Sequence, residues 1–397
     1  MPEDKEAKVY ILVIGNGFDL ELGLPTSCHE FLKRANGVLE YKRAKIEPDS
    51  DENGLDLLKA LIKHKYLDNF CNLLKESVWL EYFNNDLKSR TRENTWAGFE
   101  QSIREVILRF ETYYIENSRI VIFAGEKYRN FYKVLSSREG TKEDTTIELN
   151  GKESKKFIEK LLAQLERFTQ AFKIYCACFI NDYVENHSTE LRRRLCSDIP
   201  CDYVLSFNYT KTFEILNNRK STKYCYIHGF AQKALSKDHL VLGIDETLNN
   251  KEKSKHLEFA GFKKYYQRIS CPTASRFFST SGAKYKDWLE YLRRRPSSDA
   301  RNDQIYIVGH SMSKTDHDVL KELILKPAYK HCNFIVTVLY HNDGSKANAI
   351  AQMTIMLGQD KLIERVHSDK QTIRFGSQFG MRTHDSGRMT FFNKKSN

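Results

Sequence analysis

The chain has 397 residues, enough for one large or about two to three ordinary domains. Its 41% hydrophobic and 12% aromatic content excludes a disordered or fibrous protein. The net charge of +11 favours acidic partners such as nucleic acid or phosphorylated small molecules, although the arginine triplets 192–194 and 293–295 fit solvated helix faces equally well.

Cysteine usage and hydropathy predict a reduced, cytoplasmic protein. The nine cysteines show neither disulfide-framework nor zinc-site spacing. The apolar run near the N-terminus is too short for a secretory signal, and no run approaches the roughly 18 apolar residues of a membrane span. Because no run is long enough to span a membrane, we predict no membrane partner. The twelve histidines show no paired ligand spacing, so we also predict no metal site.

The first predicted strand, residues 9–14, is an apolar, β-branched run that suits a central strand covered on both faces. It ends in the turn Gly15-Asn16-Gly17, where the missing side chains would let a ligand approach the backbone. A short helix should follow, and the N–H groups at its start favour phosphate. The charge of Asp19 would repel a phosphate, so this residue is expected to cap the turn or to bond a ribose hydroxyl. A plain structural turn fits the stretch equally well.

The next part of the chain repeats its apolar residues at helical spacing and contains one proline, near its beginning. We therefore predict a helical insertion over residues 35–199, with no strand inside 55–135. Within it, the motif Trp96-x-x-Phe99-Glu100 supplies a carboxylate that could project towards a site. The favoured alternative places Trp96 and Phe99 in the core and Glu100 in solvent.

Short apolar strands return after the insertion, at residues 203–207, 224–227, 240–244, 305–308 and 334–339. Each delivers a polar residue or a glycine at its end, as Asn208, His228 and Gly309 illustrate. Ligands of open α/β sheets bind outside the carboxyl ends of the strands. We therefore expect these three residues to share one cleft with Gly15, Asn16 and Asp19, and the helical insertion to form its other wall.

The predicted fold class is α/β, with a Rossmann-like, mostly parallel sheet and a large helical insertion. The sheet should contain the strands at 9–14, 203–207, 224–227, 305–308 and 334–339. The predicted domains are the first strand and glycine loop of the core (8–34), the helical insertion (35–199), the remainder of the core (200–375) and a polar, poorly ordered tail (376–397).

Several motifs, in order from about Val9 to Leu320, resemble those of the bacteriophage abortive-infection AbiH family. They are Ile14-Gly15-Asn16-Gly17-Phe18-Asp19 with Gly23-Leu24-Pro25-Thr26, Trp96-x-x-Phe99-Glu100, Ser206-Phe207-Asn208-Tyr209-Thr210, Ile227-His228-Gly229 and Gly309-His310-Ser311-Met312. AbiH-type proteins in turn resemble sirtuin-like domains. The sirtuin glycine loop corresponds to Gly15-Asn16-Gly17, and the asparagine of the sirtuin T-x-N-x-D block corresponds to Asn208. The sirtuin His-Gly pair corresponds to His228-Gly229, and the late glycine-serine block to Gly309-His310-Ser311. Asp19 and the missing zinc-binding cysteine quartet depart from deacetylating sirtuins and point to the sirtuin-like NAD hydrolases of phage defence.

This resemblance implies an anti-phage effector that hydrolyses NAD, its substrate, to nicotinamide and ADP-ribose. Asn208 would hold a water or a ribose hydroxyl, and His228 would act as general base. The nucleotide-binding residues would be Gly15, Asn16, Gly17, Asp19, Gly309, His310 and Ser311. The structural alternatives are a helix N-cap for Asn208, a buried turn residue for His228 and a helix cap for Asp316.

Two other functions stay open from the sequence. The charge suits a nucleic-acid-directed effector, either a nuclease or an RNA-binding module, although the carboxylate clusters of a metal nuclease are not evident. The glycine loop also suits a nucleotide-sensing module without catalysis. A phage-derived trigger and a homo-oligomer are compatible with all three functions.

Overall fold

The computed structural model describes residues 9–89, 96–123, 128–135, 146–195, 201–217, 219–232, 240–248, 252, 256–271, 273, 302–325, 333–369 and 371–379. The chain divides into two compact units. The sheet unit consists of residues 1–24, 181–230 and 272–397, and the helical unit of residues 25–180 and 231–271. These units differ from the predicted segments, because residues 25–34 and 231–271 belong to the helical unit and 181–199 to the sheet unit.

The sheet unit is built on one six-stranded sheet in the order β5-β4-β1-β6-β7-β8. Its strands are β1 (Tyr10–Ile14), β4 (Tyr203–Ser206), β5 (Lys223–Tyr226), β6 (Asn302–Val308), β7 (Asn333–Tyr340) and β8 (Ile373–Ser377). All five neighbouring pairs run parallel, which confirms the predicted sheet. The central strand β1 pairs Ile11 with Tyr203 on one side and with Ile305 on the other.

One predicted strand and one predicted domain boundary were wrong. Residues 240–244 form no strand of this sheet, since only Ile244 makes a single bridge, to Lys263, and both residues belong to the helical unit. The predicted tail begins too early, because β8 continues to Ser377 at the edge of the sheet. Only two of the residues of β8, Ile373 and Phe375, are large and apolar, so its sequence alone does not separate an edge strand from a polar tail.

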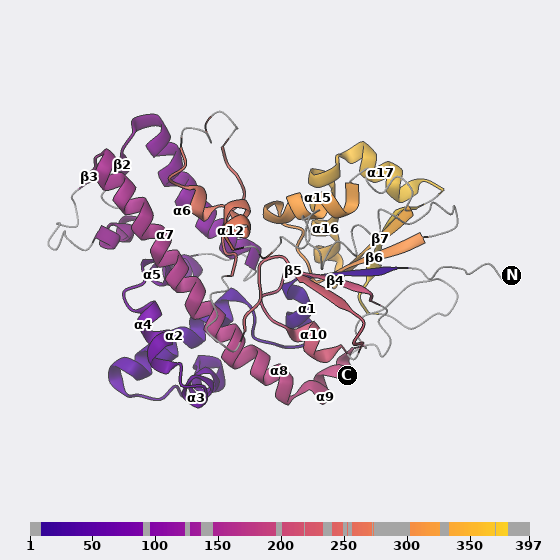
Figure 1. Cartoon of the computed structure of the whole chain (residues 1–397), viewed down its shortest axis with the longest axis horizontal. Coiled ribbons are helices and arrows are strands. Elements are labelled where there is room, and N and C mark those ends of the chain that lie inside the picture. Colours follow the sequence, from indigo (N-terminus) through magenta and orange to yellow (C-terminus); the bar gives the residue numbers. More distant parts are fainter. Residues whose placement is uncertain are drawn as a thin grey trace. The chain divides into compact units, whose positions relative to one another are not determined.

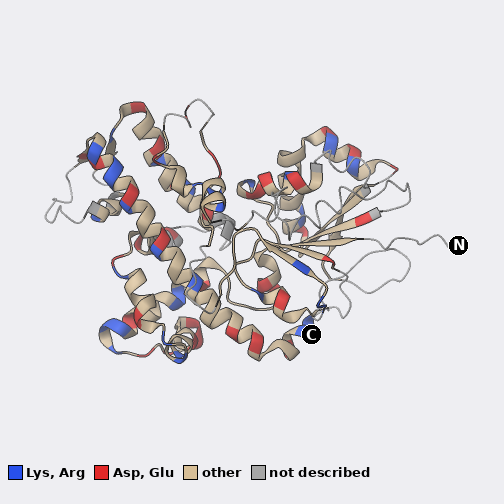
Figure 2. Cartoon of the chain, viewed as in Figure 1, with Lys and Arg blue, Asp and Glu red and all other residues tan. Residues whose placement is uncertain are grey.

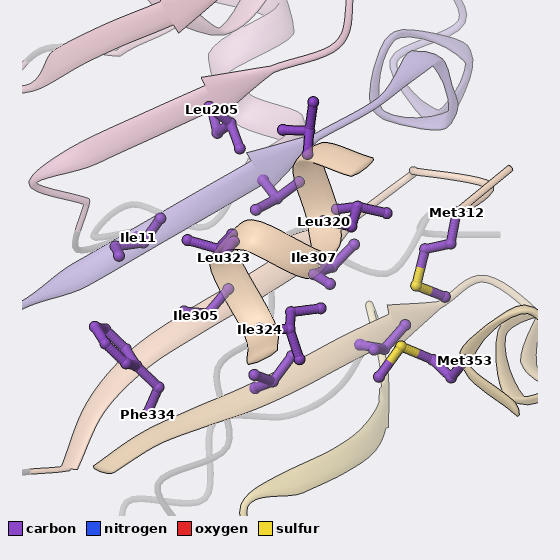
Figure 3. Close-up of a cluster of buried hydrophobic side chains, with 14 of the residues drawn as sticks. Ile11, Leu205, Ile305, Ile307, Met312, Leu320, Leu323, Ile324, Phe334 and Met353 are labelled. Carbon is purple, nitrogen blue, oxygen red and sulfur yellow. The ribbon is translucent and has the colours of Figure 1, made fainter. Parts of the chain in front are cut away.

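Helices cover both faces of the sheet (Figure 1). Those of the sheet unit are α1 (Asn16–Glu21), α8 (Asp182–Asn186), α9 (Ser188–Arg194), α10 (Thr212–Leu216), η5 (Lys314–Asp316), α15 (His317–Leu325), α16 (Asp343–Leu357) and α17 (Gln359–His367). Alternate residues of β1 face opposite sides, so Ile11 and Val13 join a core with α15, α16 and α17. Figure 3 shows apolar side chains of this core, including Leu320 and Met353, pointing towards one another.

The helical unit is mostly α-helical, as predicted. Its elements are α2 (Cys28–Ala44), η1 (Asp51–Asn53), α3 (Leu55–Lys63), α4 (Leu67–Leu74), α5 (Val78–Ser89), α6 (Trp96–Asn117), η2 (Arg129–Leu135), α7 (Gly151–Ile174), η4 (Ala260–Phe262) and α12 (Lys264–Ser270), and a π-helical turn, Tyr175–Asn181, follows α7. The expectation of no strand in 55–135 was wrong, because β2 (Ile120–Ile122) pairs antiparallel with β3 (Ile147–Leu149). Three buried β-branched residues form β2, a run too short for periodicity to identify.

Buried ion pairs join α6 to the second segment of the helical unit. Lys264 Nζ lies 2.7 Å from Glu100 Oε1, and Lys263 Nζ lies 2.9 Å from Glu111 Oε2. The side chains of both pairs are at most 8% exposed. Glu100 therefore lies in the protein interior, and the prediction that it is solvated was wrong, whereas Phe99 is buried as predicted. Two adjacent lysines dock residues 263–264 on one helix because each buried cation needs its own carboxylate.

Two turns cross at the carboxyl end of the sheet, one after β1 and one after β6. Gly15 N–H donates to Val308 O over 3.1 Å, and Gly17 N–H donates to Gly309 O over 2.8 Å. A Cβ on Gly17 would lie 2.8 Å from Gly309 Cα, and one on Gly309 would lie 2.5 Å from the carbonyl carbon of Gly17 and meet Phe18 N. Gly309 also has a φ of +61°. Side chains at this crossing would force the two turns apart.

The crossing gives a stability prediction. Gly358 also has a positive φ, +87°, but nothing lies within 4 Å of the position of its Cβ. We expect Gly358→Ala to cost about 1–3 kcal/mol, through backbone strain alone. Gly309→Ala should cost more than about 4 kcal/mol, because it adds a backbone clash to the strain of a positive φ. Urea denaturation measures both losses of unfolding free energy. Equal losses in Gly309→Ala and Gly358→Ala would show that the crossing does not need glycine at residue 309.

Candidate functional site

Two N–H groups of the glycine turn, those of Gly15 and Gly17, are directed at the protein's own backbone. Besides the bonds of Gly15 and Gly17, Phe18 N–H donates to Gly15 O over 2.9 Å. The sequence predicts that such donors bind a phosphate, but in this conformation the N–H groups of Gly15 and Gly17 bond across the turn crossing and that of Phe18 bonds within its own turn. The glycines therefore hold the two turns together, and nucleotide binding by Gly15, Gly17 and Gly309 stays a prediction.

Asp19, on α1, forms a buried carboxyl cluster with the chain that follows β4. Its Oδ2 accepts the hydroxyl proton of Thr210 over 2.5 Å, and Thr210 in turn accepts from Thr212 over 3.1 Å. Burial raises the pKa of Asp19 from 3.8 to about 6, although contacts with Thr210, Thr212 and Asn208 pull it down. Asp19 therefore does not cap the turn, and a carboxyl that titrates near neutral pH stands at the strand ends.

The segment after β4, residues 207–210, divides its side chains between this carboxyl cluster and a second cluster around His228. Phe207 and Tyr209 pack against the His228 ring, with centroids 5.4 Å and 6.0 Å away, whereas Asn208 and Thr210 contact Asp19. Residues 207 and 209 thus serve one cluster, and residues 208 and 210 serve the other.

Asn208 is 3% exposed, and among the described residues neither polar atom of its amide has a hydrogen-bond partner of ordinary geometry. The N-cap of α10 is Lys211, so the interpretation of Asn208 as that cap was wrong. A buried amide without hydrogen bonds costs roughly 1–3 kcal/mol, which a ligand's hydroxyl or a water could offset.

The second cluster joins two histidines through one carboxylate. His228 Nε2 lies 3.1 Å from Asp316 Oδ1, and His310 Nε2 lies 3.6 Å from Asp316 Oδ2. Phe207 packs on both rings, with its centroid 4.2 Å from that of His310. The side chains of the two histidines and of Asp316 are at most 8% exposed. The cluster thus collects side chains that follow β4, β5 and β6.

Two histidines hold the turn after β6 in a strained conformation. Met312 has a φ of +52°, unusual for a long side chain. Its N–H donates to His310 Nδ1 over 2.9 Å, and its carbonyl accepts from His317 Nε2 over 2.9 Å. Burial lowers the pKa of His317, which favours the neutral ring in this position. Strain of this kind is common where a backbone is held for function.

The structure brings several predicted site residues together at one sheet edge, namely Gly15, Gly17, Asp19, Asn208, His228, Gly309 and His310. No hydrogen bond joins Asn208 to His228 in the described part of the chain. Asn16 is half-buried and Ser311 is exposed. Sequence reasoning missed Thr210 and Thr212, whose two-residue spacing after β4 was the available signal, and it assigned Asp316 only as a helix cap.

A comparison with known protein families covers most of the chain. A family model described as "Bacteriophage abortive infection AbiH" matches residues 11–338, which include both clusters. No curated protein matches the sequence. Within the described ranges, no helix has the length and apolar character to cross a membrane, and no group of three or more His, Cys, Asp or Glu side chains is placed to hold a metal ion.

The pKa of Asp19 generates a pH prediction. The folded chain keeps this proton to about pH 6, whereas an ordinary carboxyl loses it near 3.8. Between these values the folded state binds more protons than the unfolded state, so the free energy of unfolding falls as pH rises. Asp19→Asn should remove this fall, worth about 3 kcal/mol for about two pKa units. Urea denaturation of both proteins from pH 4 to pH 8 measures it.

Thr210→Val provides the complementary test. This change removes a hydrogen bond that lowers the pKa of Asp19, so the fall in stability should extend to higher pH than in the wild type. If the free energies of unfolding of the wild type and Asp19→Asn change in parallel from pH 4 to pH 8, the pKa of Asp19 is not raised in the folded chain.

Proposed function

Since the chain belongs to the bacteriophage abortive infection AbiH family, we propose that it performs its abortive-infection role by hydrolysing NAD at the strand ends of the sheet unit. The observation that carries this proposal is the buried amide of Asn208, neither polar atom of which has a hydrogen-bond partner of ordinary geometry among the described residues. Its place at the carboxyl end of a parallel sheet is where nucleotides bind in open α/β folds. An amide can bind both a water and a ribose hydroxyl, since it donates and accepts.

The reaction would proceed through an oxocarbenium-like state at the ribose carbon that carries nicotinamide. The bond from this carbon to nicotinamide breaks, and its electron pair leaves with neutral nicotinamide. A water oxygen bonds to the same carbon, and His228 takes the water's proton. Asn208 orients the water or the neighbouring hydroxyl. In this proposal the reacting ribose would lie between Asn208 and His228, which no hydrogen bond joins in the described part of the chain.

The remaining predicted residues take secondary roles in this proposal. Asp19, on the Asn208 side, would accept a hydrogen bond from a ribose hydroxyl once it is ionised, above about pH 6. Asn16, His310 and Ser311 would contact the rest of the nucleotide. The glycines act through the turn crossing, which sets the positions of these residues.

The charge argument for a nucleic-acid partner is weaker than the sequence suggested. Arg192 donates to Leu216 O and Ile215 O, and Arg194 donates to Leu22 O, so two members of the first arginine triplet bind the C-terminal ends of α10 and α1. The second triplet, 293–295, lies outside the described residues. Figure 2 shows acidic and basic residues interspersed along the helices. These contacts favour the small nucleotide over a nucleic acid.

The direct test is release of nicotinamide from NAD by the purified protein. We expect His228→Ala and Asn208→Ala to lower turnover by about 10²–10⁴-fold, through loss of the base and of the orienting amide. Asn208→Ala should change the melting temperature little, because neither polar atom of the wild-type amide has a hydrogen bond of ordinary geometry that the variant would lose.

Asn181→Ala is the matched control, because this asparagine is also buried in the sheet unit but accepts the N–H of Lys211 over 3.0 Å. It should lower the melting temperature and spare turnover at temperatures where the variant is folded. Folded, fully active Asn208 and His228 variants would remove both residues from the mechanism. NAD binding without turnover would leave a nucleotide sensor as the function.

A further inference from the structure

We infer that Asp316 is the positioning residue of this site, fixing the imidazoles of His228 and His310 so that Nδ1 of His228 faces the substrate as the base. The carboxylate contacts Nε2 of both rings, over 3.1 Å and 3.6 Å. The effect of Asp316 on catalysis rests on the proposed function, whereas its effect on the orientation and tautomers of the two histidines does not.

The tautomer of His310 follows from its second contact. Its Nδ1 accepts the N–H of Met312, so this nitrogen carries the lone pair and the ring proton of the neutral form is on Nε2. That proton faces Asp316 Oδ2. His310 is therefore held at both nitrogens, by the backbone of its own turn and by Asp316.

The tautomer of His228 follows from its contact with Asp316. An ionised carboxylate only accepts hydrogen bonds, so it binds the neutral imidazole through a protonated Nε2. The lone pair is then on Nδ1, the nitrogen that can take a proton from water. Phe207 and Tyr209 pack against the ring, so the plane of the imidazole is set by aromatic contacts and its tautomer by the carboxylate.

Asp316 can act on two histidines because of its position in the chain. It is the last residue of η5, immediately before α15, while His228 follows β5 and His310 follows β6. The carboxylate thus links the ends of two strands that are not neighbours in the sheet. A residue that only capped α15 would have no effect on the tautomer of either histidine.

Asp316→Asn separates positioning from helix capping. Asparagine has the same size and caps helices as well as aspartate does. Its amide, however, can donate to an unprotonated Nε2, which releases His228 into the tautomer with the proton on Nδ1. We expect kcat for NAD hydrolysis to fall by about 10²–10⁴-fold with little change in KM or melting temperature.

The matched control is Asp303→Asn. Asp303 is also a buried aspartate of the sheet unit, but its Oδ1 accepts the backbone N–H of Val9 over 2.8 Å and contacts neither histidine in a hydrogen bond of the described chain. This variant should lower the melting temperature and leave both kcat and the histidine tautomers as in the wild type.

The tautomers are read directly by nitrogen NMR of the full chain with ¹⁵N-labelled histidine, without NAD. The His228 signals are those lost in His228→Ala. We expect the proton on Nε2 in the wild type and a population with the proton on Nδ1 in Asp316→Asn. A wild-type proton on Nδ1, or no change in Asp316→Asn, would overturn the inference. If the tautomers follow Asp316 while the wild type hydrolyses no NAD, positioning stands and the proposed function falls.

Discussion

The arrangement of the site depends on the close approach of two backbone turns. The turn after β1 and the turn after β6 exchange hydrogen bonds at a separation that leaves no room for a Cβ on Gly17 or Gly309. This contact fixes the position of α1 relative to the loop that carries His310. Asp19 lies on α1, so its position is fixed as well. The glycines are needed for packing, whereas a reading of the sequence alone attributes them to ligand access.

The sheet could be predicted because each apolar, β-branched strand is recognisable by itself. The parallel direction of the strands follows from the helical stretches that connect them. The pairing of side chains could not be predicted. Asp19 and Thr210 meet across 191 positions, a contact that no local pattern encodes. Glu100 was placed in solvent because the sequence gives no sign that Lys264, far along the chain, would neutralise it.

The candidate site was predicted as a single set of converging residues, and the structure divides it in two. The segment 207–210 sends Asn208 and Thr210 to a carboxyl, and Phe207 and Tyr209 to a histidine. One cluster is therefore suited to holding hydroxyl groups and the other to moving a proton. Strain at Met312 costs about 1–3 kcal/mol, a penalty that two histidine contacts and the apolar core offset.

The place of β1 in the sheet also affects the order of events during synthesis. Ile11 pairs with Tyr203 and Ile305, so the first strand to leave the ribosome waits for both of its neighbours. At roughly 5–20 residues per second, the second neighbour emerges about 15 to 60 seconds later. Until then this apolar strand has two unpaired edges, which are open to pairing with another chain. The contacts of Asp316 with His228 and His310 cannot form before residue 316 emerges, so the histidine cluster is completed late in translation.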